Sequence, residues 1–452
     1  MTPNQSTASN WKALFRVPGF PFFFAAMLVS LFGTGMNFAG VTWYVLGVTH
    51  STVKVSLIVI LVTLPGLIVP PFGGVLIDRV DRRYLGITID VGRAVVVLCT
   101  AALAYMRNLA LWELYTMVLL LGVGFAIYWS TTNALIQELV PHDKLITANA
   151  TVLIAVQGGM AAAGALVGFI YERAGLAGIL GIDGTTYLIS ALCLLLLRDG
   201  YCAPHEFQNI RLVSSSPTIE APPEMSEPGL MRTDEPEPGD AGRGASGVFA
   251  DIAEGLAYLR EQPRVMALGF TYACMMAGVI SANVLVVALA KDQLSVGARG
   301  YGYIEMGWAF GAVAGGLAAG TMARKKPYTV MVVALAILAV GHMMFPYARV
   351  LMAAVLMNAL FGVCRALGGV LTQSSIMASV PRHLMGRTQS AFSVISTILQ
   401  VGMSFALGWF AEHVTLSIAF LLLGAIYGGG VLAALRVRAL SLGAEKTPAP
   451  AV

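Results

Sequence analysis

Apolar residues along this chain gather in long runs that are separated by short polar segments. Each run is close to or above 20 residues, which is the length that an α-helix needs to cross the hydrocarbon core of a bilayer. The pattern therefore predicts an all-α membrane protein with twelve transmembrane helices. Their expected ranges are 20–48, 55–77, 84–106, 110–137, 146–171, 175–197, 264–290, 298–322, 328–346, 349–379, 387–411 and 415–437.

A long polar segment divides these runs into two groups of six. Residues 198–247 are rich in proline and in acidic residues, a composition that cannot bury a core, so we expect a largely disordered linker there. Residues 251–260 resemble a short surface helix that leads back into the bilayer. The expected units are a tail (1–19), a six-helix bundle (20–197), the linker (198–263), a second six-helix bundle (264–437) and a tail (438–452).

The placement of the basic residues predicts the orientation. If the N-terminus is cytoplasmic, 20 of the 28 Lys and Arg residues fall on the cytoplasmic side, six fall on the other side, and Arg93 and Arg365 lie within spans. Cytoplasmic loops carry an excess of Lys and Arg, so both termini and the linker are expected in the cytoplasm. The first apolar run is long enough to remain in the membrane, and we expect no removable signal peptide.

Composition supports a membrane protein and excludes several other classes. Hydrophobic residues make up 57% of the chain and charged residues only 12%, whereas soluble domains carry about 25% charged residues. No basic face with interleaved aromatic residues suggests nucleic-acid binding. The five cysteines show no paired spacing, so we expect neither a metal site nor a disulfide framework.

The loop after the second run carries an unusual concentration of charge. Gly73-Gly74-Val-Leu-Ile-Asp78-Arg79-Val-Asp-Arg82-Arg83 cannot lie in hydrocarbon, where each charge costs roughly 2.5–3.5 kcal/mol, and its glycines permit close approach of a helix end. A related segment, Gly315-Gly316 to Arg324-Lys325-Lys326, follows 242 residues later, and Val140-Pro141 recurs 240 residues later as Val380-Pro381. Duplicated six-helix bundles are a transporter architecture with a binding site between the halves.

This loop has two possible roles. Its charges either stop the helices and set topology, or form contacts that bias two arrangements of the bundles. The second copy keeps its cations but has Gly320 in place of Asp78, and a topology signal alone does not need that acid. The difference favours a conformational switch.

Polar residues inside the spans are costly in lipid and are expected to face protein or water. Asp90 and Arg93 are three residues apart and can pair on one helical face, bracing the loop. Glu305 and Arg365 are candidates for proton coupling or for an ionic group of the substrate, although they could instead neutralise each other or bind backbone carbonyls. The uncharged candidates for a substrate or proton cavity are Asn37, Tyr128, Thr132, Gln157 and Asn283; each could equally make only an interhelical hydrogen bond.

No catalytic constellation is present in the sequence. There is no GxxxxGK[ST] segment that would cradle ATP phosphates, no HExxH, and no Ser/His/Asp set on one membrane face. We therefore expect a protein that is not an enzyme and needs no cofactor.

The loop Gly73–Arg83 resembles the loop motif of the major facilitator superfamily, and the two groups of six spans around a central linker fit that family throughout. Asp90 and Arg93, the stretch Asn133-Ala134 to Val140-Pro141, and Ile182-Asp183 resemble its macrolide-efflux and enterobactin-exporter-like branch. The resemblance implies that Gly74, Asp78, Arg79, Arg82 and Arg83 form a cytoplasmic gate, which is closed when the protein opens outward. Two departures weaken the drug-antiporter pattern, since Leu121 and Gly122 stand where relatives carry an arginine and span five lacks the expected proline.

These observations predict a monomeric secondary transporter that works by alternating access in a bacterial-type cytoplasmic membrane. The expected function is export of amphipathic or hydrophobic small molecules such as drugs, with protons as the coupling ion. The alternatives are a siderophore or lysophospholipid transporter of the same fold, or a transporter-shaped receptor or scaffold.

Overall fold

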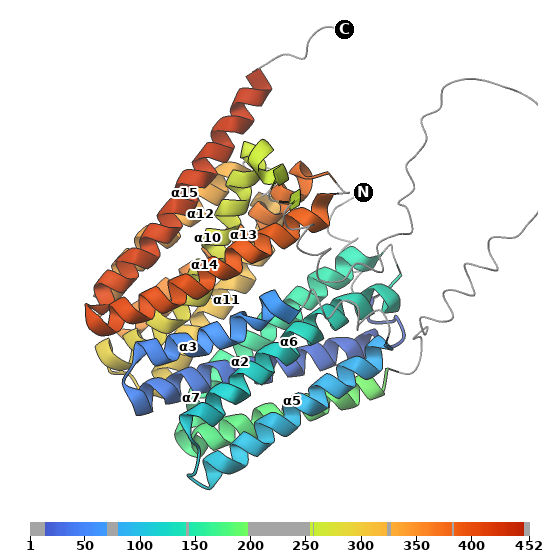
Figure 1. Cartoon of the computed structure of the whole chain (residues 1–452), viewed down its shortest axis with the longest axis vertical. Coiled ribbons are helices and arrows are strands. Elements are labelled where there is room, and N and C mark those ends of the chain that lie inside the picture. The colour runs from blue at the N-terminus through green and yellow to red at the C-terminus, as the bar shows by residue number, and fades with distance from the viewer. Residues whose placement is uncertain are drawn as a thin grey trace, which may run out of the picture.

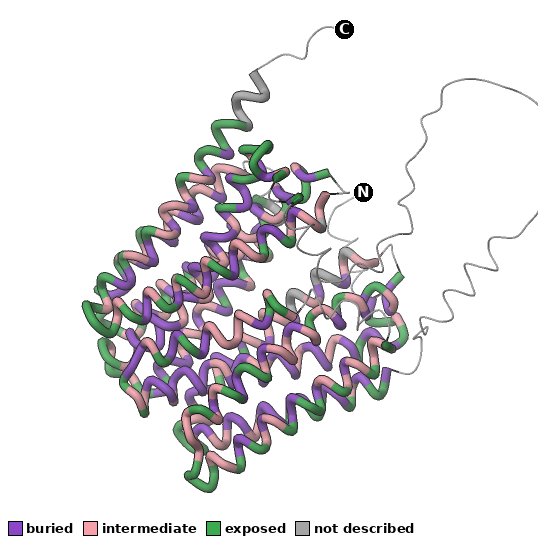
Figure 2. The backbone as a smooth tube through the Cα atoms, in the orientation of Figure 1, coloured by how far each residue is buried: buried purple, intermediate pink, exposed green. Residues whose placement is uncertain are grey.

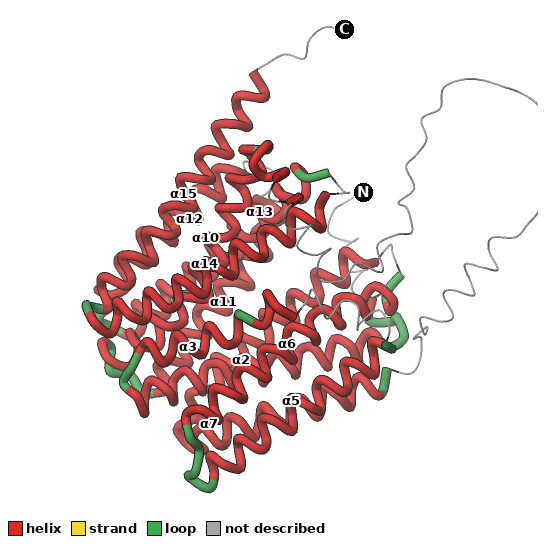
Figure 3. The backbone as a smooth tube through the Cα atoms, viewed as in Figure 1, coloured by secondary structure: helices red, strands yellow, loops and turns green. Residues whose placement is uncertain are grey.

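The chain forms a bundle of long helices (Figure 1). The computed structural model describes residues 14–69, 80–141, 144–197, 254–255, 257–322, 327–381 and 384–446. Over these ranges the regular secondary structure is helical (Figure 3). The elements are α2 (Phe20–Thr49), α3 (Thr52–Thr63), α5 (Arg82–Tyr105), α6 (Leu111–Leu139), α7 (Leu145–Leu195), α10 (Pro263–Ala288), η2 (Leu289–Gln293), α11 (Ala298–Met322), α12 (Pro327–Met344), η3 (Phe345–Tyr347), α13 (Leu351–Ser379), α14 (Met385–His413) and α15 (Leu416–Lys446).

Ten of the helices in the described ranges are long and apolar enough to cross a membrane. This number counts α7 once, although its backbone leaves the helical conformation at Gly175 (φ 61°, ψ −161°), which divides it into two arms. It also leaves out α11, which is 25 residues long. With α7 as two arms and α11 included, the helices correspond to the twelve predicted spans.

The observed bounds differ from the predicted ranges by more than two residues in two spans, the second and the last. The second span begins at Thr52 and is interrupted at Leu64, after which helix continues to residue 69; the rest of the predicted range, 70–77, lies outside the described residues. The last helix, α15, continues to Lys446 instead of ending at residue 437. Residues 438–446 are mostly good helix formers, so the polar end of the helix extends beyond its apolar part.

Local sequence signals explain where several helices begin. Ser51 caps α3 by accepting a hydrogen bond from the backbone N–H of Lys54. Asp81 caps α5 by accepting from the backbone N–H of Arg83, at 2.9 Å. Pro263 occupies the first turn of α10, where its missing N–H has no intrahelical partner to lose. These residues set the points at which the chain enters the bundle.

The helices form two halves that lie side by side (Figure 1). In the first half, α2 and α5 pack against α7, and α6 packs against α5 and α3. In the second half, α11 packs against α13, α10 against α14 and α15, and α12 against α15. The halves meet mainly along two seams, α7 with α11 and α3 with α14, and α10 also contacts α3 and α2. This arrangement places the central helices of both halves around a common axis.

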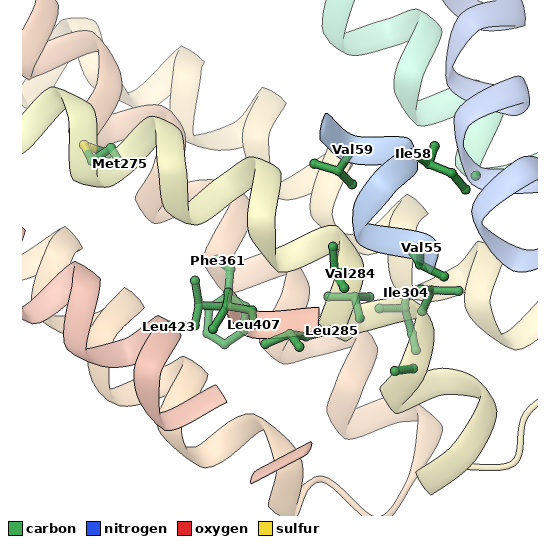
Figure 4. Packing of buried hydrophobic residues seen from close by; sticks show 14 of the residues in the cluster. Val55, Ile58, Val59, Met275, Val284, Leu285, Ile304, Phe361, Leu407 and Leu423 are labelled. Carbon is green, nitrogen blue, oxygen red and sulfur yellow. The ribbon is translucent and has the colours of Figure 1, made fainter. Parts of the chain in front are cut away.

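Burial follows the inside of the bundle, and the outward faces remain apolar. Buried residues concentrate where helices face each other, as Figure 2 shows. The largest apolar cluster spans both halves and includes Val55 and Ile58 of α3, Leu285 of α10 and Phe361 of α13 (Figure 4). Large apolar side chains such as Trp112, Phe310 and Leu432 are exposed on the outside. An apolar exterior of this kind is suited to lipid.

Candidate functional site

Hydrogen bonds join α3 and α14 at the end of the molecule that holds the α2–α3 and α14–α15 turns. We call this the outer end, and the opposite end, which holds the Pro141 and Pro381 turns, the inner end. Glu412 accepts hydrogen bonds from the Ser51 hydroxyl (2.6 Å) and the Val53 backbone N–H (3.0 Å). The Thr52 hydroxyl donates to the Gly408 carbonyl at 2.7 Å. These bonds hold the two halves together at the outer end.

A second seam at the outer end is built on glycine. A Cβ atom added at Gly168 of α7 would lie 2.4 Å from the carbonyl oxygen of Ala298 and 2.4 Å from the Cα of Arg299. The Arg299 guanidinium also pairs with Glu172 at 2.6 Å. The backbones of α7 and α11 can therefore approach closely only because Gly168 has no side chain. Toward the inner end the two halves diverge (Figure 1).

A cavity of about 330 Å³ lies between the halves. Its volume falls in the range of small-molecule sites. Apolar side chains from both halves make up much of its wall. The wall residues whose side chains carry a polar N–H, O–H, amide or charged group are Thr34, Asn37, Arg93 and Tyr187 from the first half and Asn283, Glu305, Trp308, His342, Asn358, Arg365 and Tyr427 from the second. The cavity thus presents a mainly apolar surface with a few polar groups.

Glu305 and Arg365 both line this cavity, and neither has an ionic partner among the described residues. Glu305 is half-buried and makes no described hydrogen bond. Among the described residues the Arg365 Nη2 atom donates to the Met276 sulfur at 3.3 Å, and its Nε atom is buried without a hydrogen-bond partner. An uncompensated charge in such a site is costly, so both side chains are available to a ligand.

The two charges lie far apart along the bundle. Gly311 of α11 faces Ala359 of α13, and Gly315 faces Val363, so the two helices run parallel with an offset of 48 residues. At that offset Arg365 is level with residue 317, which is twelve positions beyond Glu305. At 1.5 Å per residue, their Cα atoms are separated by about 18 Å along the helix axis. The structure therefore does not bring Glu305 and Arg365 together.

The first half contains a buried polar network around Arg93. The Arg93 Nη1 atom donates to Asp90 Oδ1 at 3.1 Å, as the spacing of three residues predicts. Its Nη2 atom donates to the Thr34 hydroxyl at 3.2 Å, and its guanidinium carbon lies 3.9 Å from the centre of the Tyr187 ring. Asp90 is fully buried and also accepts from the Ser190 hydroxyl at 2.6 Å.

Asp183 lies in the same region, and the residue analysis of the sequence did not select it as a site residue. It is fully buried and accepts a hydrogen bond from the Asn37 amide at 2.6 Å. The sequence does contain a signal for Asp183, because it is a carboxylate within an apolar run, as Glu305 is. His342 was also missed: it lines the cavity and its ring stacks 4.1 Å from the ring of Phe361.

The uncharged candidates separate into two groups. Asn37 and Asn283 line the cavity, and the Asn283 amide also donates to carbonyls of its own helix. Tyr128, Thr132 and Gln157 are not among the residues that line it. Tyr128 is buried beneath the Arg93 guanidinium, at 5.1 Å, and the Thr132 hydroxyl donates to the carbonyl of Tyr128 at 2.9 Å. Tyr128 and Thr132 therefore pack inside the first half and do not line the cavity.

The predicted gate is described only in part. Gly74, Asp78 and Arg79 lie outside the described residues. Arg82 pairs with Glu138 of α6 at 2.5 Å, and Arg83 donates to the carbonyls of Leu194 and Leu195. Both arginines therefore join the start of α5 to neighbouring helices of the first half at the inner end.

Comparison with known proteins gives one family. A model of the Major Facilitator Superfamily matches residues 22–407. The enterobactin exporter EntS of Salmonella typhimurium is 25% identical over 394 residues, which cover 85% of this chain and 83% of that protein. Macrolide efflux protein A of Streptococcus pyogenes is 27% identical over 137 residues, so the match spans 30% of this chain and about a third (33%) of that relative.

Solved structures share the fold at low sequence identity. The nucleoside transporter NupG (D323A mutant) superposes with a TM-score of 0.67 at 11% identity, covering 93% of this chain and 99% of that chain. A bacterial homologue of the lysosomal transporter Spinster, in an inward-facing and unoccupied conformation, has a TM-score of 0.64 at 13% identity and covers 96% of this chain and 99% of its own. These similarities concern the fold alone.

Proposed function

The chain belongs to the major facilitator superfamily, whose members are secondary transporters and not enzymes, and on this premise we propose that it exports amphipathic or hydrophobic small molecules in exchange for protons. The observation that carries the proposal is the cavity between the halves, which combines a mainly apolar wall with two charged side chains, Glu305 and Arg365, that have no ionic partner among the described residues. Such a wall gains free energy from any apolar ligand surface that it buries, about 25 cal/mol per Å², and so tolerates varied shapes.

The two uncompensated charges support specific roles. Glu305 has no cationic partner in the part of the chain that the structure describes, so a proton or a cationic group of the substrate can neutralise it. Competition between a proton and a cation for one carboxylate would couple their movements in opposite directions. Arg365, about 18 Å away along the helix axis, is placed to meet an anionic group of a substrate.

Alternating access is supported by the way in which the halves meet. The described contacts that hold the outer end include a few hydrogen bonds, the Arg299–Glu172 ion pair and the glycine seam between α7 and α11, and all of them can separate without unfolding either half. Opening the outer end while the inner end closes would expose the same cavity to the opposite side. In this proposal the transporter works as a monomer in a bacterial-type cytoplasmic membrane, with both termini in the cytoplasm.

A siderophore is the second candidate substrate. Arg365 is an uncompensated cation on the cavity wall, and anionic chelators carry the opposite charge. The enterobactin exporter is also similar over most of its length, although at only 25% identity. A lysophospholipid could also pair with Arg365, through its phosphate. The transport assay below distinguishes siderophores from lysophospholipids.

The test is transport by the purified protein in proteoliposomes with an imposed pH gradient. Lipophilic drugs, siderophores and lysolipids are each offered, and we expect gradient-driven movement of drugs. Glu305→Gln should abolish the effect of the gradient, because the side chain no longer binds a proton.

Glu113→Gln is the matched control, since Glu113 caps α6 at the outer end by accepting from the Ala110 N–H and a glutamine oxygen can also accept. Substrate movement that ignores the pH gradient in the unmodified protein would refute proton coupling. Movement of siderophores or lysolipids alone would refute the drug-export part of the proposal.

A further inference from the structure

The buried network of the first half contains more negative than positive charge. Asp90, Arg93 and Asp183 lie within it, so two carboxylates face one guanidinium. All three side chains are buried, with exposed fractions of 0%, 4% and 0%. An ionised carboxylate buried without a compensating charge is strongly disfavoured. One of the two carboxylates therefore requires either a proton or a second cation.

The hydrogen bonds identify which carboxylate is uncompensated. Asp90 has a donor on each oxygen, Arg93 on Oδ1 and the Ser190 hydroxyl on Oδ2. Among the described residues Asp183 is met by neutral donors, the Asn37 amide on Oδ2 and the Tyr187 hydroxyl. Its Oδ1 atom is buried without a hydrogen-bond partner among the described residues and packs against α2 at Gly33, where a Cβ atom would lie 2.5 Å from it. Asp183 is thus the better site for a proton.

Arg93 has the freedom to serve either carboxylate. Its Nη1 atom binds Asp90, its Nη2 atom binds the neutral Thr34 hydroxyl and its guanidinium also contacts Tyr187, while its Nε atom has no hydrogen-bond partner among the described residues. The charge of Arg93 also acts on Asp183. The other ionisable side chains that face this region are Tyr187 on the same arm of α7 and Tyr128 on α6, and neither supplies a second cation. A deprotonated Asp183 would therefore compete with Asp90 for Arg93.

Part of this network is exposed to the central cavity. Thr34, Asn37, Arg93 and Tyr187 all line the central cavity, and the hydroxyls of Thr34 and Tyr187 lie 3.1 Å apart. These groups place Asp183 one residue layer behind the cavity wall. A proton donor in the cavity can reach the carboxylate through them.

We infer that Asp183 is a proton-binding site of the first half, and that Arg93 moves from Asp90 to Asp183 when that proton leaves. On protonation the Asp183 carboxylate takes a proton from hydronium in the cavity, which leaves water and a neutral acid, and Arg93 returns to Asp90. Because Asp90 and Arg93 belong to α5 whereas Asp183 belongs to α7, the exchange alters how α5 is held against α7 and α2. The role of this site in coupling rests on the proposed proton-driven function, but the protonation itself does not.

Infrared spectroscopy of the full chain in proteoliposomes tests the inference without any substrate. A protonated carboxylic acid has a carbonyl stretch distinct from that of a carboxylate. The measurement uses a Glu305→Gln background, so that the cavity carboxylate does not contribute. We expect a carboxylic-acid band at neutral pH that Asp183→Asn removes and that the control Glu113→Gln leaves unchanged.

Asp90→Asn tests the exchange of Arg93. It leaves Asp183 intact but removes the competing carboxylate, so Arg93 should pair with Asp183 and the same band should be lost at neutral pH. A band that persists in Asp183→Asn would overturn the proton site. A band that is lost in Asp183→Asn but unchanged in Asp90→Asn would overturn the exchange. Gel filtration of each variant excludes loss of the fold as the cause.

A transport measurement separates this inference from the proposed function. Where the unmodified protein moves a substrate with the pH gradient, Asp183→Asn should abolish gradient-driven accumulation but keep movement down a substrate gradient. Retained gradient-driven accumulation would overturn the coupling role of Asp183. If no drug is transported at all, the proposed substrate class fails while the infrared result still decides on the proton site.

Discussion

Gly168→Ala should open the outer end of the molecule. In the structure a Cβ atom at this position would lie 2.4 Å from the carbonyl oxygen of Ala298 and from the Cα of Arg299, well inside van der Waals contact. Both are backbone atoms and cannot rotate away, so α7 and α11 must separate. Overpacking of this kind costs about 1–3 kcal/mol. The cost applies only where the two helices are packed, that is, in the arrangement closed at the outer end.

The expected shift follows from that energy. A penalty of about 1–3 kcal/mol on one of two states changes their ratio by about 5- to 150-fold toward the other state. Replacing glycine by alanine also favours any helix by about 1 kcal/mol. Rigid-body movement of the halves keeps α7 helical at this position, so we expect the same gain in both arrangements, and it cancels from the ratio.

Thiol labelling measures the shift. The five native cysteines are replaced, Asn283 on the cavity wall is changed to cysteine, and a membrane-impermeant reagent is added on the side of the membrane that the outer end faces in the proposed topology. Labelling in Gly168→Ala should be faster by about the 5- to 150-fold change in the ratio of states. The control is Gly181→Ala on the same helix element, where a Cβ atom meets nothing within 4 Å. Equal labelling rates in the two variants would refute the assignment of the α7–α11 seam as an outer gate.

Three further predictions concern polar contacts. Glu412→Gln should weaken the outer end by about 0.5–1 kcal/mol, because its bonds to Ser51 and Val53 lose their charge, and a double-mutant cycle with Ser51→Ala should show that the two changes are not additive. Arg299→Gln should change the same labelling rate by less than about fivefold, since its pair with Glu172 is partly exposed and contributes about 0–1 kcal/mol; a larger effect would contradict that estimate. Asp78→Asn should reduce transport while expression and membrane insertion remain normal, and a normal transport rate would count against a switch at this residue.

The sequence predicts which charged residues pair within one helix, but not which pair between helices. The pair of Asp90 and Arg93 is predicted from its spacing because residues three apart share a face of a single helix, and the structure confirms the contact at 3.1 Å. Asp183 is 90 positions farther along the chain than Arg93, and no periodicity relates the two. Whether a second carboxylate shares that guanidinium depends on how α7 packs against α5 and α2, which is a tertiary property.

Tyr128 and Gln157 show that the sequence could not predict which polar residues face the cavity. Each is a polar residue in an apolar run, which predicts that it faces protein or water but does not say which. The packing buries Tyr128 beneath Arg93, and neither residue lies on the cavity wall. The rotation of a helix about its axis is set by its neighbours, and a helix in the centre of a bundle has neighbours on several sides.

The sequence by itself determined that the chain crosses a membrane many times in two related halves, because the length and spacing of apolar runs are fixed by the thickness of the bilayer and are properties of local sequence. It also set where several helices begin, through the capping residues Ser51 and Asp81 and through Pro263, which act within one turn. Only the tertiary structure decided which polar groups meet. The contacts of Glu412 with Ser51, of Gly168 with Ala298 and of Asp183 with Asn37 join residues more than 100 positions apart. Such contacts arise when whole helices pack, and the free energy of that packing is distributed over many side chains that no local pattern records.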